Sequence, residues 1–250
     1  MPRKARAKSE QQIYHVMLRG INRQQIFYDE EDYRYFEGLL NRYKKDCGFL
    51  LLAYCLMGNH VHLLIMEREE PIDNIFRHIG SAFVYWYNIK YDRVGHLFQD
   101  RYKSEPVDNE QYLLTVFRYI LNNPVKAQIC RKAEDYPYSS AREYLMGATG
   151  ITDQDMIKNL LDDYNMREFI CAENDDECLD VEEHAKRRCT DETAKQIIMS
   201  ELGTFTPNID KKNRDTLHES ICKMIGKGIS IRQLSRLTGI SKKIIENALK

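Results

Sequence analysis

The fold is decided by the stretch Phe49-Leu50-Leu51-Leu52-Ala53-Tyr54-Cys55-Leu56-Met57-Gly58-Asn59-His60-Val61-His62-Leu63-Leu64-Ile65-Met66. Two apolar runs flank Gly58-Asn59, a pair typical of a tight turn, so the sequence predicts a β-hairpin with strands over 49–57 and 60–67. Side chains alternate faces along a strand, which places the imidazoles of His60 and His62 side by side. Two such imidazoles suit a divalent metal ion, although a His-x-His pair by itself is more often two ordinary half-buried histidines.

A segment further along the chain offers partners for these histidines. Apolar residues recur there at helical spacing and predict a helix over 110–122, which Pro124 is expected to end. Tyr119 and Asn123 are four residues apart and share a helix face, so the helix can present a phenol and an amide oxygen together. The plainer alternative is a tyrosine at the rim of the core and an asparagine that caps the helix.

The remaining periodicity predicts a domain in which strands and helices are interleaved. It indicates a strand at 13–19, helices at about 30–46 and 72–91, and a short hairpin-like segment near 96–107. This order favours a small antiparallel sheet with helices on one face, an α+β arrangement.

Several stretches carry a family resemblance, in this order: Tyr14-His15-Val16-Met17-Leu18-Arg19-Gly20-Ile21-Asn22-Arg23, Met57-Gly58-Asn59-His60-Val61-His62, Gly95-His96-Leu97-Phe98-Gln99-Asp100-Arg101-Tyr102-Lys103-Ser104, Arg118-Tyr119-Ile120 and Asn122-Asn123-Pro124-Val125. Together they resemble the REP-associated tyrosine transposases, a branch of the single-tyrosine HUH transposases, which act on single-stranded DNA. The resemblance covers about residues 12–146. One departure is Ile21, where many relatives have a second Asn, and it bears on DNA contacts rather than on catalysis.

The resemblance implies a fold and a set of roles. The fold would be ferredoxin-like, with the histidines on a central strand of the sheet. His60 and His62 would bind a divalent metal, and Tyr119 would be the nucleophile. The third ligand would be Asn123, with the adjacent Asn122 as the alternative. Relatives include dimers that share active sites as well as monomers, so a homodimer is one expectation for this chain.

The chemistry of these groups is coherent in itself. Tyrosine attack on a phosphodiester requires the charge of the phosphate to be offset and the phenol to be made nucleophilic. Neutral imidazole and amide ligands leave a metal ion its full positive charge, and they suit Mg²⁺ or Mn²⁺. The product would be a 5′-phosphotyrosyl linkage with a free 3′-hydroxyl. Because a second 3′-hydroxyl can reverse this step, strand transfer on hairpin-forming single strands is the expected reaction.

Aromatic and basic side chains are interleaved between the second predicted helix and residue 104. Bases stack on aromatic rings while phosphates pair with cations, so this mixture is typical of a surface that binds single strands. The residues expected to contact DNA are Tyr87, Tyr91, Arg101 and Lys103, together with Arg19 and Arg23 beside the first strand. Part of the mixture, including Phe83 and Trp86, is expected to be core.

Charge divides the chain into three parts. Residues 1–150 carry 21 Lys+Arg against 19 Asp+Glu, residues 151–190 carry 5 against 12, and residues 191–250 carry 11 against 7. Two mildly basic ends therefore flank an acidic middle, as expected if the ends contact nucleic acid. We predict a catalytic domain over 1–146, an acidic helical connector over 147–190 and a helical DNA-binding domain over 191–250.

The last predicted domain contains a pattern similar to a helix-turn-helix. In residues 231–245, Gly239 is expected in the turn, Ser241 would cap the second helix, and Ile240 would pack inward. Lys242 and Lys243 would then face a phosphate backbone or a major groove. The alternative is a helical hairpin used only for packing.

The composition indicates the cellular compartment of the protein. The seven cysteines form no Cys-x-x-Cys pair and their odd number argues against a disulfide framework. No apolar run reaches membrane-spanning length and the first residues lack the apolar region of a signal peptide, so a cytoplasmic protein without a membrane partner is expected.

Three functions are compatible with these observations. The favoured one is a metal-dependent DNA strand transferase. The second is a catalytically silent DNA-binding regulator that keeps the fold and the helix-turn-helix. The third is a metal-dependent phosphoesterase that uses water, in which Tyr119 would be structural. Trapping a covalent protein–DNA adduct separates the first from the other two.

Overall fold

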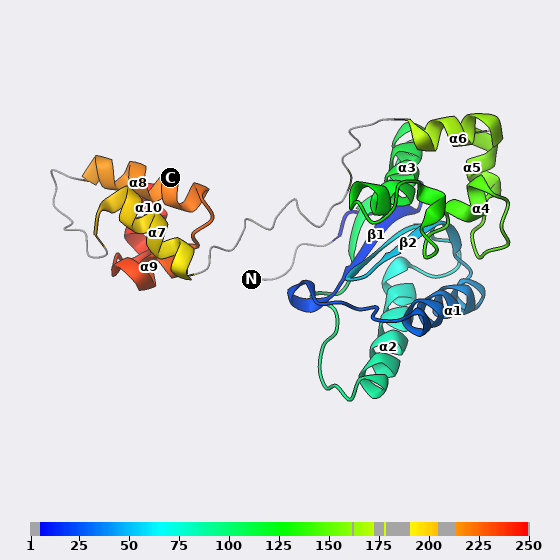
Figure 1. The fold of residues 1–250 in the computed structure, drawn as a ribbon, viewed down its shortest axis with the longest axis horizontal. Coiled ribbons are helices and arrows are strands. Elements are labelled where there is room, and N and C mark those ends of the chain that lie inside the picture. Colours follow the sequence, from blue (N-terminus) through cyan, green and yellow to red (C-terminus); the bar gives the residue numbers. More distant parts are fainter. Residues whose placement is uncertain (1–5, 162, 173–177, 179–190, 205–213, 250) are drawn as a thin grey trace. The chain divides into compact units, whose positions relative to one another are not determined.

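The computed structural model describes residues 6–161, 163–172, 178, 191–204 and 214–249 (Figure 1). The chain forms two compact units, Met1–Leu179 and Asp180–Lys250. In the described residues, no helix combines the length and the apolar character that crossing a membrane requires.

The first unit is built on a four-stranded antiparallel sheet. Its strands are β1 (Ile13–Arg19), β2 (Leu50–Met57), β3 (His60–Met66) and β4 (Lys103–Pro106), and their order is β2-β3-β1-β4. The predicted α+β class is confirmed, and β3 is a central strand as expected. The predicted hairpin near 96–107 is instead the single strand β4, which pairs with β1 at the edge of the sheet.

The helices of this unit lie on both faces of the sheet (Figure 1). They are α1 (Glu30–Asp46), α2 (Ile72–Lys90), α3 (Glu110–Lys126), α4 (Ala141–Leu145), α5 (Asp155–Leu160) and α6 (Asp163–Cys171), with 3₁₀ turns η1 (Ile21–Arg23) and η2 (Ala133–Asp135). The expectation of helices on one face therefore describes only α1 and α2. The others cover the opposite face.

The strands explain why both faces must be covered. Leu51, Tyr54 and Leu56 of β2 join the core beneath α1 and α2. Ala53 and Cys55 of the same strand join a second core beneath α3 and α4. A strand that is apolar on both faces leaves water-exposed apolar surface unless each face receives a layer of helices.

The sequence predicted that this helix would end at Pro124, but α3 continues to Lys126. Proline lacks the N–H that would bond to the carbonyl of residue 120, and its ring crowds that carbonyl, at a cost of about 3 kcal/mol in a helix interior. The following turn persists because Ala127 N–H donates to the Asn123 carbonyl at 2.9 Å and Ile129 N–H donates to the Pro124 carbonyl at 2.9 Å. Pro124 is itself buried in α3, so packing of this turn offsets the cost.

Residues 151–161 and 163–171 belong to the first unit rather than to a separate connector. Ile157 of α5 and Met166 and Ile170 of α6 are buried in the core shared with α3. The Asn122 amide donates to the Ile170 carbonyl at 2.7 Å and ties α6 to α3. The predicted boundary at 146 thus falls inside a packed layer, and residues 173–177 and 179–190 of the predicted connector lie outside the described residues.

The second unit is helical, as predicted, and has its own core. Its helices are α7 (Asp191–Leu202), α8 (Arg214–Gly226), α9 (Ile231–Thr238) and α10 (Lys242–Ala248). Between α9 and α10, Gly239 has a φ of 73°, a left-handed conformation that glycine adopts without strain. Ser241 accepts a hydrogen bond from Ile244 N–H as the N-cap of α10, and Ile240 and Ile245 are buried.

The position of this boundary makes a testable prediction about truncations. A fragment of residues 1–148 lacks Ile157, Met166 and Ile170. The apolar surfaces that these three side chains cover would therefore be exposed to water. Burial of three such side chains contributes roughly 5–9 kcal/mol, which is comparable to the whole stability of a domain. We therefore expect residues 1–179 to unfold cooperatively in urea, and residues 1–148 to aggregate or to lack a cooperative transition. A fully stable 1–148 fragment would contradict the assignment of α5 and α6 to this unit.

Candidate active site

Three of the sequence stretches meet at one end of the sheet. Gly20 N–H donates to the Asn59 carbonyl at 3.0 Å, and Ile21 N–H donates to the Leu97 carbonyl at 2.9 Å. A Cβ atom at Gly20 would clash with the carbonyl oxygen of Gln24, so this close approach of backbones requires glycine. The end of β1, the β2–β3 turn and the segment before β4 therefore form one substructure around the histidines.

His60 and His62 share the face of β3 that α3 covers. Their ring centroids are 5.0 Å apart and the rings are nearly perpendicular. His62 is fully buried, whereas His60 is half-buried. The Nδ1 of His60 donates to Asn59 Oδ1 at 2.6 Å, so in the neutral ring the lone pair lies on Nε2.

Helix α3 brings Tyr119 against these histidines. The Tyr119 ring meets the His62 ring edge to face, with centroids 5.7 Å apart, and its side chain is almost entirely buried. One turn later, Asn123 is buried as well and its Nδ2 donates to the Tyr119 carbonyl at 3.0 Å. This leaves Oδ1 as the donor atom that Asn123 can offer to a metal. The fold therefore brings the phenol of Tyr119 against His62, with Asn123 one turn further along the same helix.

The two candidate third ligands differ in their surroundings. Asn122 uses its amide to hold Ile170 of α6, whereas Asn123 lies on the same face of α3 as Tyr119. This arrangement favours Asn123 over Asn122.

Two further residues join the group, and the sequence did not single out either. His15 of β1 is fully buried, and a 2.9 Å hydrogen bond joins its Nε2 to Nδ1 of His62. Its Nδ1 is 3.8 Å from Glu105 Oε2 on β4. Lys126 places its Nζ 5.1 Å from the centroid of the Tyr119 ring. Lys126 follows Tyr119 by seven residues, a helical spacing that could have indicated a shared face, but His15 depends on the pairing of β1 with β3.

The donor atoms of the histidines fit a divalent metal ion. With Nδ1 of His62 bonded to His15, its buried Nε2 has no hydrogen-bond partner among the described residues. Burial lowers the pKa of His62 well below its usual range, and the neighbouring His60 and His15 lower it further. The imidazole is therefore neutral at physiological pH, which is the form that binds metals.

Four of the residues expected to contact DNA are exposed or half-buried in the first unit. Arg23 is exposed and has a φ of 61°, and the preceding Asn22 has a φ of 51°, two left-handed conformations that non-glycine residues adopt rarely. Arg19 is half-buried and pairs with His60 in the β1–β3 register. Lys103 is exposed at the start of β4, and Arg101 is largely exposed with Asp73 at 4.0 Å.

The two tyrosines of that prediction have structural roles instead. Tyr87 is fully buried, its hydroxyl donates to the Gln25 carbonyl at 3.2 Å, and burial raises its pKa to about 12. No face of its ring is available to a base, so the expected DNA contact at Tyr87 is wrong. Tyr91 is half-buried and donates its hydroxyl to the buried carboxylate of Asp32 at 2.8 Å, which anchors it to α1. The sequence pattern could not separate these rings from exposed ones.

A cavity of about 920 Å³ lies between α2 and residues 96–102. Its lining mixes rings, cations and amides, and includes Tyr85, Phe98, Arg77, Arg101, Asn74, Asn88 and Gln99. Tyr85 is 72% exposed, so its ring is accessible for stacking, unlike that of Tyr87.

Lys242 and Lys243, in the second unit, are exposed in the first turn of α10.

The first unit is thus an α+β domain in which a His-x-His strand faces a helix tyrosine across a buried interface. Residues 8–123 match the family described as "Transposase IS200 like". Members of this family are endonucleases of the HUH type.

One solved structure has a similar fold. A REP-associated tyrosine transposase bound to a REP hairpin superposes with a TM-score of 0.51 at 19% identity, over 62% of this chain and 96% of that chain. A crystal structure of a transposase-like protein from Deinococcus radiodurans R1 has a TM-score of 0.35 at 21% identity, over 48% of this chain and 97% of that chain. No curated protein matches the chain significantly.

The position of His15 leads to a prediction about metal affinity. Replacing His15→Ala removes the group that orients His62, and loss of such an outer partner weakens metal binding by about 10- to 100-fold. We expect Mn²⁺ titration to show this loss, and His15→Gln, whose amide can still meet Nδ1 of His62, to recover part of it. His218→Ala in α8 is the control. Unchanged Mn²⁺ affinity in folded His15→Ala would contradict an orienting role.

Proposed function

We propose that the first unit is a metal-dependent single-stranded DNA endonuclease and strand transferase that works through a covalent tyrosine intermediate. The observation that carries this proposal is the buried contact between Tyr119 and His62, with Asn123 one helical turn away. The family match over residues 8–123 supports the same reaction class.

The reaction assigned to Tyr119 is a phosphoryl transfer. Its phenol oxygen attacks the phosphorus of a DNA phosphodiester and loses its proton. The bond from phosphorus to the 3′-oxygen breaks, and this oxygen leaves as a hydroxyl after taking up a proton. The product is a 5′-phosphotyrosine, and attack by the 3′-hydroxyl of another strand reverses the chemistry and joins the two strands.

His60, His62 and Asn123 would hold the metal, with Mg²⁺ or Mn²⁺ as the ion. When bound, the ion offsets phosphate charge and orients the phosphate for in-line attack. His15 fixes the ring of His62 through the 2.9 Å hydrogen bond. Lys126, whose ammonium lies beside the Tyr119 ring, adds positive charge where the phenol becomes anionic and where the phosphate must approach.

The proposed substrate is a hairpin-forming single strand. The similar transposase is bound to a REP hairpin, and the cavity between α2 and residues 96–102 offers accessible rings and cations of the kind that bind single strands. Arg19, Arg23, Arg101 and Lys103 would contact phosphates around the first unit. Lys242 and Lys243 would add duplex contacts from the second unit, where Ser241 and Gly239 give α9 and α10 a turn like that of a helix-turn-helix.

This function predicts that Tyr119→Phe abolishes covalent attachment to DNA while binding stays nearly unchanged. The substitution removes the nucleophilic oxygen but keeps the ring that packs against His62. Each protein would be incubated with a hairpin oligonucleotide and Mg²⁺, and the products separated on a denaturing gel. Tyr112→Phe in the same helix is the matched control and should still form the adduct.

The same gel separates the alternatives. A catalytically silent regulator would form no adduct and would leave the strand uncut. A phosphoesterase that uses water would cut the strand without an adduct, and Tyr119→Phe would still cut it.

A second prediction concerns the metal ligands. His60→Ala and His62→Ala should each reduce cleavage to background, and a chelator should do the same to the unaltered protein, because a site of three neutral ligands retains little affinity after losing one. Asn123→Ala should be milder, since water can replace an amide oxygen. The readout is cleavage of a labelled hairpin over a Mn²⁺ titration. Full activity in chelator would remove the metal from this mechanism.

A further inference from the structure

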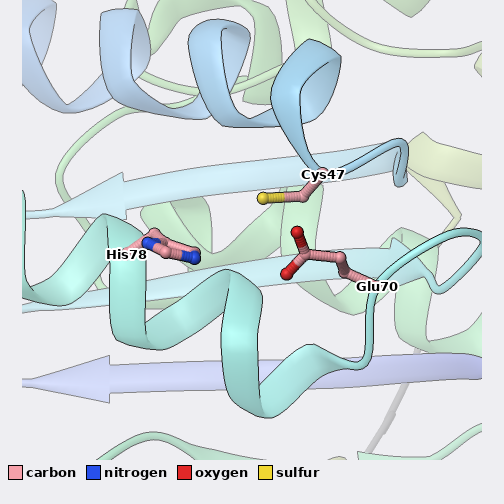
Figure 2. A group of neighbouring side chains, drawn as sticks. All are labelled: Cys47, Glu70 and His78. Atoms are coloured by element: carbon pink, nitrogen blue, oxygen red, sulfur yellow. The ribbon is translucent and has the colours of Figure 1, made fainter.

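A second group of metal-binding side chains lies away from the candidate active site. Cys47 caps the C-terminus of α1, Glu70 precedes α2, and His78 lies two turns into α2. Their Sγ, carboxylate oxygen and ring nitrogen all lie within 4.8 Å of one another. Figure 2 shows the three side chains converging on one point from three separate segments.

The donor atoms of this trio are available to an ion. Among the described residues, no hydrogen bond or ion pair engages the Cys47 sulfur, the Glu70 carboxylate or a nitrogen of His78. The His78 ring is held by stacking on Tyr43 of α1, with centroids 5.6 Å apart and planes at 16°. Three convergent donors without protein partners differ from an ordinary salt bridge, in which charged groups satisfy one another.

The spacing of the trio is close to that of a zinc site. Tetrahedral zinc, with bonds of about 2.0–2.3 Å to sulfur, nitrogen and oxygen, holds its ligand atoms roughly 3.5 Å apart. Rotation of the Glu70 carboxylate and the His78 imidazole, neither of which is fully buried, can close the remaining gap. A soft thiolate and an imidazole both suit zinc, whereas Mg²⁺ prefers oxygen ligands.

Electrostatics at Cys47 favour a cation. The thiol is buried, and burial, together with the negative charges of Glu70 and Asp46, raises its pKa. The same negative surroundings attract a divalent ion, which takes the thiolate as ligand while the proton passes to solvent.

We propose that Cys47, Glu70 and His78 form a zinc site that ties the end of α1 to the start of α2. This site is separate from the candidate active site because Cys47 belongs to the core beneath α1 and α2, whereas Tyr119 belongs to the core on the opposite face of the sheet. A fourth position remains for water, so the ion has three protein ligands. Its role is structural, since a metal that binds only the folded chain stabilises it.

Cobalt(II), which replaces zinc and reports thiolate ligation by a charge-transfer band, is the probe. The full-length His60→Ala variant would be titrated so that the first site does not compete. We expect one equivalent to bind with that band. Cys47→Ser should abolish the band, and Glu70→Gln and His78→Asn should each weaken binding at least about tenfold, since loss of even an outer partner has an effect of this size.

Matched controls are Cys171→Ser and His96→Ala, which alter an exposed cysteine and an exposed histidine elsewhere. Both should retain the site. At a given zinc concentration, the unfolding temperature of the parent protein should rise more than that of Glu70→Gln, because Glu70 lies outside the buried core and its replacement leaves that core intact. Absence of the band, or equal affinity in Glu70→Gln and His78→Asn, would overturn the proposal, because binding would then rest on a cysteine alone. Neither result depends on whether Tyr119 cleaves DNA.

Discussion

The antiparallel pairing of β1 with β3 is the constraint on which the rest of the first unit depends. It sets Arg19 opposite His60 and Met17 opposite His62. Side chains alternate with a period of two, so a slip of one residue would turn both histidines to the face covered by α1 and α2. The apolar residues of β1 and β3 oppose this slip, because Val16, Leu18, Val61 and Leu63 belong to one buried core and Ile13 and Leu64 belong to the other.

Burial then shapes the chemistry at the interface between β3 and α3. Tyr119 and His62 lie in a buried layer, where polar groups without partners are costly and electrostatic interactions are strong. The hydrogen bond between His15 and His62 satisfies one ring nitrogen and leaves the other for a ligand. The packing that stabilises the domain is therefore the same packing that keeps His62 neutral and holds the phenol beside it.

The two faces of the sheet have different roles. The face beneath α3 holds the group around Tyr119, while α1 and α2 on the other face enclose an aromatic core that includes Phe27, Phe36 and Phe83. The cavity beside α2 uses the solvent-facing side of that helix, and the proposed zinc site lies near its first turns. A helix whose inner side is fixed by rings can present polar groups outward in a constant geometry.

Local patterns in the sequence determined the first three strands, the main helices and the shared faces of His60 with His62 and of Tyr119 with Asn123, because periodicity and spacing act within one element. The tertiary structure decided whatever depends on distant partners. Tertiary packing allows α3 to continue beyond Pro124 and buries Tyr87. It also makes α5 and α6 part of the core of the first unit rather than of a connector. Strand register brought His15 to His62, and helix packing brought Cys47 to Glu70 and His78. These contacts join segments far apart in the chain, and their free energy comes from burial that no local pattern encodes.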